Sequence, residues 1–216
     1  MIQNTQNFRT YWQNKGSEFG KCHTLQNSPW FWINIPKNAS SFTQTLFAHQ
    51  LLWTPHNYFD IDVRDKTAIV VLRDPVERWI SGISEYVSLY HKNFNLNDLN
   101  NQMLDWIFDR VAFDDHTEAQ IYFIQDLDLS KTIWFRCDMD FENKLIKWME
   151  SVGLVQSGFQ VPDCVREFDN ISSSDHVKKN IKTYFRQVIE SNPGYLRSLK
   201  KYFDEDYNLI NQINFK

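Results

Sequence analysis

The sequence predicts an α/β fold with three layers, in which a central parallel sheet is flanked by helices. Two short segments, 30–35 and 68–72, are almost entirely apolar, as expected for strands that are covered on both faces. Each is followed by a helical pattern, and strands that alternate with helices are typical of a parallel sheet. The chain has 216 residues, of which 42% are hydrophobic. This size predicts a single domain over 1–216, with 1–28 as a polar N-terminal segment that is irregular or weakly helical.

The first predicted strand is Trp30-Phe-Trp-Ile-Asn-Ile35, which is rich in aromatic and β-branched residues. It ends at Pro36, and the short segment Lys37-Asn-Ala-Ser-Ser41 leads into a helical pattern that begins at Phe42. Ser41 and Gln44 have the spacing of a capping box, which would fix the start of this helix.

The second predicted strand is Ala68-Ile-Val-Val-Leu72, and a helix is expected directly after it. Asp74 is suited to cap this helix, Pro75 to occupy its first position and Glu77 to complete a capping box. Apolar residues then recur at helical spacing as far as Tyr90 and predict a face that packs on the core.

The rest of the chain continues the alternation. A third strand is expected over 131–136, and 152–174 is expected to be a looser connection. Helices are expected over 98–110, 115–126, 140–151, 175–190 and 193–204.

Composition excludes several classes of function. The net charge of −4 and the pI of about 5.9 argue against a nucleic-acid-binding surface that covers the whole protein. The three cysteines are widely spaced and show neither a disulfide framework nor a C-x-x-C metal motif, so no metal is expected. The sequence has no apolar signal-peptide region and no apolar run of membrane-spanning length. We therefore expect a soluble cytoplasmic protein with no membrane span.

The residues that follow the first two strands have the chemistry of an anion site. Lys37 supplies an ammonium and Ser40 and Ser41 supply hydroxyl donors at the start of a helix, where anions are favoured. Arg73 ends the second strand, and Ser81 lies two turns into the next helix, off its apolar face, so the pair suits a second phosphate. The alternatives are a solvated Lys37, and an Arg73 that is ion-paired with Asp74 or Glu77.

Two segments resemble a known family. Ile35-Pro-Lys-Asn-Ala-Ser-Ser-Phe42 resembles the 5′-phosphosulfate loop of sulfotransferases that use 3′-phosphoadenosine 5′-phosphosulfate (PAPS). Val70-Val-Leu-Arg-Asp-Pro-Val-Glu-Arg-Trp-Ile-Ser81 resembles their 3′-phosphate motif, with its R-[DN]-P-x-x-R pattern and later serine. The two motifs are most similar to those of the carbohydrate, Golgi-type branch of the family, and the chain resembles a compact soluble member of it. Weaker similarities are Asp114-Asp-His-Thr-Glu-Ala-Gln120 and the C-terminal Asn170-Ile-Ser-Ser-Ser174 and Tyr202-Phe-Asp-Glu-Asp-Tyr207.

The resemblance implies a P-loop-like sulfotransferase fold, PAPS as the cofactor with PAP as its product, and no metal. It implies a sulfuryl transfer to the hydroxyl or amine of an unidentified acceptor, for which the branch suggests a carbohydrate. It also assigns residues to the cofactor: the 5′-phosphosulfate would be held by Lys37, Asn38, Ala39, Ser40 and Ser41, the 3′-phosphate by Arg73 and Ser81, and the far side of the nucleotide by Ser172 and Lys178.

The expected catalytic residues are Lys37, at the leaving oxygen, and a general base that activates the acceptor. His56 lies between the two motifs, and His116 lies in the D-x-H stretch, so both are candidates for the base. His49, His91 and Glu118 are further options, and each of these side chains is alternatively a surface or core residue with no catalytic role.

Two other functions compete with this one. A nucleotide or metabolite kinase should carry the glycine-rich Walker-A loop, and the segment around Lys37 contains no glycine. A PAP- or PAPS-binding module without activity would keep the same loops, and an activity assay distinguishes it from an enzyme. The acceptor contacts are expected in 91–116 and 152–174.

Overall fold

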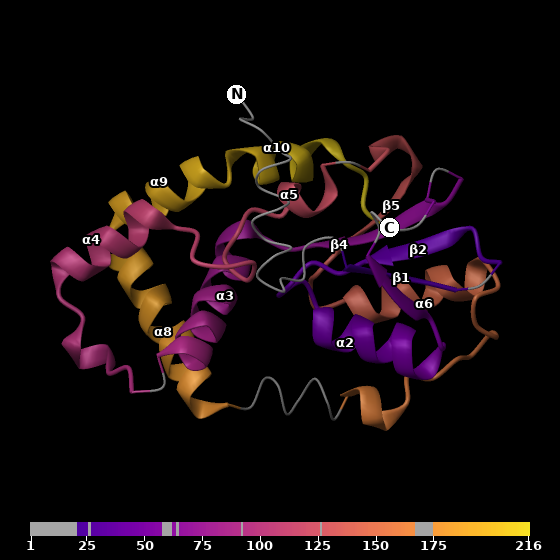
Figure 1. The fold of residues 1–216 in the computed structure, drawn as a ribbon, viewed down its shortest axis with the longest axis horizontal. Helices are drawn as coiled ribbons and strands as arrows, with labels where there is room; N and C mark the ends of the chain where they lie inside the picture. Colours follow the sequence, from indigo (N-terminus) through magenta and orange to yellow (C-terminus); the bar gives the residue numbers. More distant parts are fainter. Residues whose placement is uncertain are drawn as a thin grey trace.

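The protein is described from a computed structural model, which places residues 21–25, 27–57, 62–63, 65–91, 93–125, 127–166 and 175–216. Within these residues, one five-stranded sheet is packed between helices and is joined at one end to a further group of helices (Figure 1). The strands are β1 (Lys21–Thr24), β2 (Trp30–Ile33), β3 (Thr54–Asn57), β4 (Thr67–Leu72) and β5 (Thr132–Arg136). No helix among the described residues has the length and apolar character needed to cross a bilayer.

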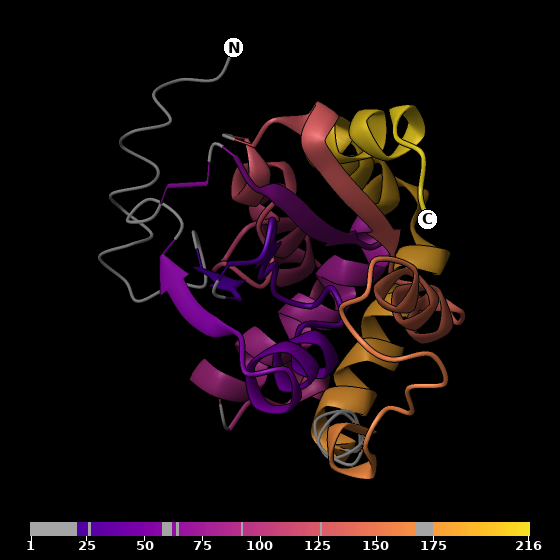
Figure 2. The same ribbon diagram turned by 90° about the vertical axis from the view of Figure 1, so that its right-hand side faces the viewer.

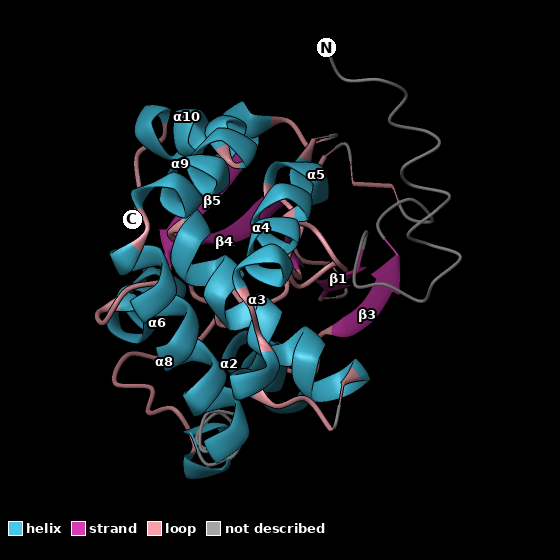
Figure 3. Ribbon diagram, turned by 90° about the vertical axis from the view of Figure 1, so that its left-hand side faces the viewer, coloured by secondary structure: helices cyan, strands magenta, loops and turns pink. Residues whose placement is uncertain are grey.

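The sheet has the order β3-β1-β2-β4-β5 and is mixed. β2, β4 and β5 are parallel neighbours, whereas β1 is antiparallel to both β2 and β3. The expectation of a purely parallel sheet is therefore wrong, although its parallel half consists of the three strands that the sequence predicted. β1 and β3 were missed because four-residue strands such as Lys-Cys-His-Thr and Thr-Pro-His-Asn carry almost no apolar periodicity. Figure 3 shows β3 at the edge of the sheet that lies away from β5.

Helices cover both faces of the sheet, as predicted. Alternate strand residues point to opposite faces, so Trp32, Ile69 and Phe135 pack on one side and Phe31, Val70 and Trp134 on the other. The first side is covered by α2 (Ser40–Gln44), by the π-helix η1 (Thr45–Gln50) and by α6 (Phe141–Ser151). The second side is covered by α5 (Ile121–Ile124) and α10 (Asp204–Gln212). Figure 2 shows α10 (yellow) and α2 (indigo) on opposite sides of the strands.

A third core lies beyond the carboxyl ends of the parallel strands. It is built from α3 (Pro75–Tyr90), α4 (Asn101–Arg110), α8 (His176–Ser191) and α9 (Pro193–Tyr202). Trp79 of α3 is fully buried there, with its indole edge-on to Phe185 of α8. α3 and α8 run side by side, and this pairing positions the charged residues described below (Figure 3).

The helix starts test the capping predictions. Asp74 caps α3 as predicted, because its Oδ1 accepts a hydrogen bond of 2.9 Å from the Glu77 N–H, and Pro75 is the first helical residue. The Ser41–Gln44 capping box is wrong, since α2 begins at Ser40, with Ala39 at the N-cap and no side-chain cap.

The remaining boundaries agree with the expectations to within about three residues, except at two places. The helix expected over 115–126 is confined to α5, because the side chain of Asp114 and the hydroxyl of Thr117 bond to the local backbone and hold 113–117 in turns. The C-terminal helical pattern is longer than expected, as α10 follows α9 after a single residue, Phe203. Two 3₁₀ turns, Leu96–Asp98 and Leu129–Lys131, complete the described elements.

Candidate functional site

The loop between β2 and α2 is fixed to the end of β4 through Asn38. The Asn38 side chain is buried, and its amide N donates to Val71 O at 2.8 Å and to Gln120 Oε1 at 2.6 Å. Lys37 and Ala39, on either side, have φ angles of 69° and 56°, a left-handed conformation that costs a non-glycine residue about 1 kcal/mol. Asn38 therefore anchors the loop, and its amide N points into the fold.

Gln120 holds the two loops together. Its Oε1 accepts from the Arg73 N–H at 3.0 Å, and its Nε2 donates to Arg73 O at 3.0 Å. The Gln120 N–H in turn donates to Asp206 Oδ2 of α10 at 2.9 Å. Arg73 is thereby fixed at the carboxyl end of β4, and its guanidinium donates to Lys37 O at 3.3 Å.

The second arginine of the R-D-P-x-x-R pattern has a structural role. Arg78 is 1% exposed, and its guanidinium donates to Pro36 O at 2.9 Å, to Asp115 O at 2.9 Å and to Glu118 O. Burial lowers the pKa of Arg78 to about 10, with the nearby carboxylates opposing the shift, so the side chain stays charged at neutral pH. It clamps the start of the Lys37 loop to the 115–118 segment.

Lys37 reaches across to α3 and binds Glu85. The Lys37 Nζ lies 2.8 Å from Glu85 Oε2, and the Nζ of Lys178 in α8 lies 2.8 Å from the same oxygen. Burial would raise the pKa of Glu85, but the two ammonium groups outweigh it and lower this pKa to about 2. Glu85 is therefore a permanent anion that occupies the donors of Lys37.

Facing residues of α3 and α8 extend this contact into a charged strip, which we call the α3/α8 seam. On α3 the seam contains Glu77, Ser81 and Glu85, and on α8 it contains Lys178, Lys182 and Arg186. The spacing of four residues places each set on one face of its helix. The seam is closed by ion pairs at both ends, since Arg186 lies 2.7 Å from Glu77 and Lys178 lies 2.8 Å from Glu85.

Lys182, between these two pairs, has no ion-pair partner among the described residues. Burial and the positive charges of Lys37, Arg73 and Arg186 lower the pKa of its ammonium, and only Glu85 opposes this shift. Arg73 makes a long contact of 3.9 Å with Glu77, which already pairs with Arg186. Five cations, Lys37, Arg73, Lys178, Lys182 and Arg186, thus share the two carboxylates of the seam, Glu77 and Glu85. This excess of positive charge favours an anionic ligand.

Hydroxyl groups accompany these cations. Ser81 lies between Glu77 and Glu85 on α3, and Ser40 and Ser41 are half-buried at the start of α2. No hydrogen bond joins any of the three hydroxyls to another described residue, and a serine hydroxyl is a donor that an anion can use.

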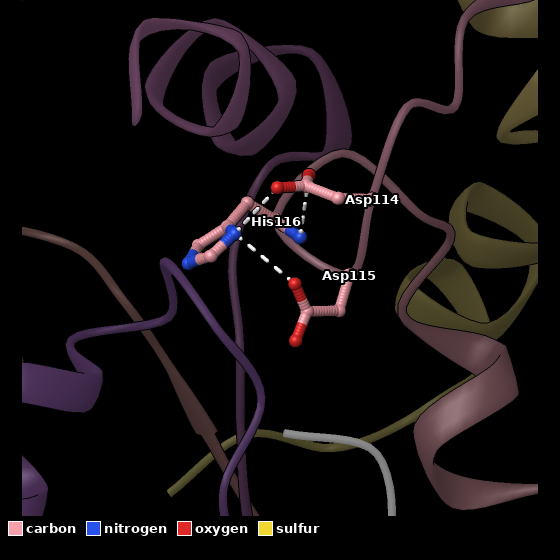
Figure 4. A group of neighbouring side chains, drawn as sticks. All are labelled: Asp114, Asp115 and His116. Carbon is pink, nitrogen blue, oxygen red and sulfur yellow. Dashed lines mark hydrogen bonds and ion pairs between the residues drawn. The ribbon is translucent and has the colours of Figure 1, made fainter. Parts of the chain in front are cut away.

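His116 is held between two carboxylates (Figure 4). The ring Nδ1 lies 2.9 Å from Asp114 Oδ2 and 3.1 Å from Asp115 Oδ1, while the backbone N–H of His116 donates to Asp114 Oδ1. Burial would lower the pKa of His116, but the two carboxylates outweigh it and raise this pKa to about 9. The imidazole is therefore protonated at neutral pH, and Nε2 is the nitrogen that these carboxylates leave uncovered. In the described part of the chain, these three side chains also lie close enough together to hold a metal ion, but here the imidazole is paired with both carboxylates.

The backbone of His116 packs against α3 at Gly82. A Cβ placed on Gly82 would lie 2.0 Å from His116 O, so only glycine permits this contact. The 113–117 turn therefore lies against α3 on the face of Arg78 and Gly82, which neighbours the face that forms the seam.

The other candidate bases lie elsewhere. His56 is on the edge strand β3, where it pairs with Cys22, and β1 separates it from β2. His49 is exposed in η1, and His91 is exposed at the end of α3. Glu118 is 5% exposed and accepts from the Tyr202 hydroxyl and the Ala119 N–H; burial raises its pKa despite these bonds. This arrangement makes Glu118 part of the structural network around Arg78.

The structure therefore brings together Lys37, Arg73 and Lys178 around the seam, whose α3 side carries Ser81, and it packs the backbone of His116 on α3 at Gly82, whereas His49 and His56 lie on other elements. Ser172 falls outside the described residues. Sequence reasoning missed Glu85, Lys182 and Arg186. The basic residues at 178, 182 and 186 repeat every four positions along a predicted helix, and this pattern was the signal that could have revealed the seam.

Comparison with known proteins adds no family or fold relative, since no family model, curated protein or solved structure matches the chain.

Proposed function

We propose that the chain is a sulfotransferase that transfers the sulfuryl group of PAPS to a hydroxyl of an acceptor. The observation that carries this proposal is the excess of cations around the α3/α8 seam, which lies where β2 and β4 end. A nucleotide with phosphate groups at both its 3′ and 5′ positions supplies two separate anions. We assign the 5′ group to Lys37 in its loop and the 3′-phosphate to Arg73 and Ser81, which flank the start of α3, together with Lys182 of α8.

The roles of the residues follow from this assignment. Lys37 donates to the oxygen that bridges sulfur and phosphorus, where negative charge grows as that S–O bond breaks. Ser40 and Ser41 donate to the other oxygens of the phosphosulfate, and Arg73, Ser81 and Lys182 bind the 3′-phosphate. Lys37 must leave Glu85 to bind the ligand, and Lys178 remains to neutralise Glu85.

The transfer forms one bond and breaks another. The acceptor oxygen forms a bond to sulfur, the bond from sulfur to the bridging oxygen breaks, and PAP leaves with the electron pair.

The acceptor proton needs a base, and His116 Nε2 is favoured over the other histidines because its 113–117 turn packs on α3 at Gly82. The two carboxylates at Nδ1 make His116 a strong base that must first lose its own proton. Activity that depends on neutral His116 is therefore expected to rise with pH up to about 9.

The proposal is tested by replacing Lys37. With radiolabelled PAPS and a panel of hydroxylated acceptors, Lys37→Ala should lower turnover by roughly 100-fold or more, because the charge on the leaving oxygen is no longer stabilised. The free energy of unfolding should fall by only about 1–2 kcal/mol, because Glu85 keeps its ion pair with Lys178 when Lys37 is removed. Lys144→Ala removes another lysine that is paired with a carboxylate, and it should leave turnover unchanged. Equal turnover in wild type and Lys37→Ala would reject the assignment. It would also be rejected if the wild-type protein transferred no label to any acceptor of the panel.

A further inference from the structure

Two cavities adjoin the end of the α3/α8 seam, one with a mixed polar and apolar lining and one that is almost entirely apolar. The first has a volume of about 510 Å³ and the second about 410 Å³. They share Val87, near the end of α3, and His91 and Phe94, which follow that helix, so the two cavities adjoin each other.

The first cavity, called the polar cavity below, has a mixed lining and begins near Glu85, which binds Lys37. Its polar groups come from Ser88 of α3, from Asn97 of the following segment and from Asp175 and Asn180 at and after the start of α8, and they face apolar residues such as Leu96 and Ile181. Ser88 follows Glu85 by three residues, which is about one helical turn or 4.5 Å along the axis. Val177, another lining residue, directly precedes Lys178. Hydroxyl and amide groups therefore face a space that starts within about one turn of Glu85, the residue that binds the Lys37 ammonium.

The second cavity is almost entirely apolar. Aromatic and aliphatic side chains of α3, α4, α8 and the 94–113 segment surround it, among them Tyr86, Leu99, Met103, Trp106, Phe113 and Phe185. Met103 and Trp106 are about half exposed at its rim, which is unusual for large apolar side chains. An apolar space of this kind binds hydrocarbon or aryl groups and offers few partners to a sugar hydroxyl.

We propose that the two cavities together bind an amphiphilic acceptor, with its hydroxylated head in the polar cavity and an alkyl or aryl group in the apolar one. The proposal rests on the proposed function in that Lys37 marks the centre of transfer. The polar cavity begins one turn from the Lys37–Glu85 pair, so it presents a head hydroxyl to the donor, while the apolar group is anchored past Val87. The acceptor class is thus a glycoside-like alcohol with a hydrophobic substituent.

Binding of octyl β-glucoside, below its micelle concentration, and of methyl β-glucoside tests this by calorimetric titration. The octyl compound should bind at least about tenfold more tightly, because burial of even a few methylene groups contributes that much. Met103→Glu places a charge at the rim of the apolar cavity and should remove this preference. Met139→Glu is the matched control, since Met139 is fully exposed in the turn before α6 and lines neither cavity, and the preference should persist in it.

A second pair of probes tests the polar cavity. Octyl β-glucoside should bind more tightly than 1-octanol, and Asn180→Leu should reduce this difference, because Asn180 lines only the polar cavity. Equal affinity for the two glucosides, or a preference that survives Met103→Glu, would overturn the proposal. PAP is titrated against the same variants. If PAP binds but the octyl glucoside is not preferred, the acceptor proposal is rejected and the proposed function stands. If the octyl glucoside is preferred but PAP does not bind, the proposed function is rejected and the cavities remain a site for amphiphiles.

Discussion

Burial and charged neighbours together lower the pKa of Lys182 and raise the pKa of His116. The effect of each shift can be tested with a single substitution. Lys182 lies among cations that are held together at a cost in electrostatic energy, and this cost is recovered when an anion binds. His116 lies between carboxylates, so its positive charge is favoured in the folded protein.

Lys182→Met should weaken binding of PAP by about tenfold or more, because one charge-assisted contact to the 3′-phosphate is lost. Binding of ADP, which has no 3′-phosphate, should change by less than about threefold under the same account. The measurement is calorimetric titration of both nucleotides, with Lys179→Met as the control, since Lys179 is exposed on α8 and outside the seam. A loss of equal size for PAP and ADP would contradict the placement of the 3′-phosphate.

His116 should make stability depend on pH. Its pKa is raised from 6.5 to about 9 on folding, so its contribution is fully present below about pH 6.5 and is lost as the pH rises through about 9. Urea unfolding of wild type and His116→Asn at pH 6.5, 8 and 10 measures this contribution. The difference in unfolding free energy between the two proteins should shrink steadily towards pH 10, and a difference that stays constant would show that the imidazole is not charged between the carboxylates.

At the scale of elements, the sequence predicted the parts that have strong periodicity or clear caps. β2, β4, β5 and α3 were found because their apolar runs, and the Asp74-Pro75 start of α3, depend on short-range physics. β1 and β3 were not found, since they exist through pairing with β2 and with each other. The same limit applies to the site: Lys37 and Arg73 follow strands and were predicted, whereas the contact of Glu85 with Lys37 spans 48 residues and needs the packing of α3.

The contact of α3 with the 113–117 turn predicts an unusual response to Gly82→Ala. In a helix interior this change ordinarily stabilises by about 0.5–1 kcal/mol. Here the new Cβ would overlap the backbone of His116, so the free energy of unfolding should fall by about 2 kcal/mol or more.

Gly194→Ala in α9 is the control for this substitution, because its Cβ would meet only side-chain atoms, of Asn192 and Arg197, and no backbone, and it should change stability by less than about 1 kcal/mol. Chemical denaturation of both variants gives the comparison. A Gly82→Ala protein as stable as wild type would show that the turn does not need its close contact with α3.

For the whole molecule, an acidic chain carries a local basic site. The net charge is −4, yet the surroundings of the α3/α8 seam hold more cations than carboxylates. Positive charges are brought together from the β2–α2 loop, the end of β4 and α8, which are distant in sequence. Composition therefore excluded a protein that is basic overall and could not exclude this site, because charge counts carry no information on which residues become neighbours.

The measurement that tests the central claim most directly is calorimetric titration of the wild-type protein with PAP, beside ADP and AMP. The account predicts micromolar binding of PAP, at least about tenfold tighter than ADP, because only PAP carries the 3′-phosphate that Arg73, Ser81 and Lys182 would bind. Equal affinity for PAP and ADP, or no binding of either, would contradict the sulfotransferase assignment and leave the seam as an anion site of another kind.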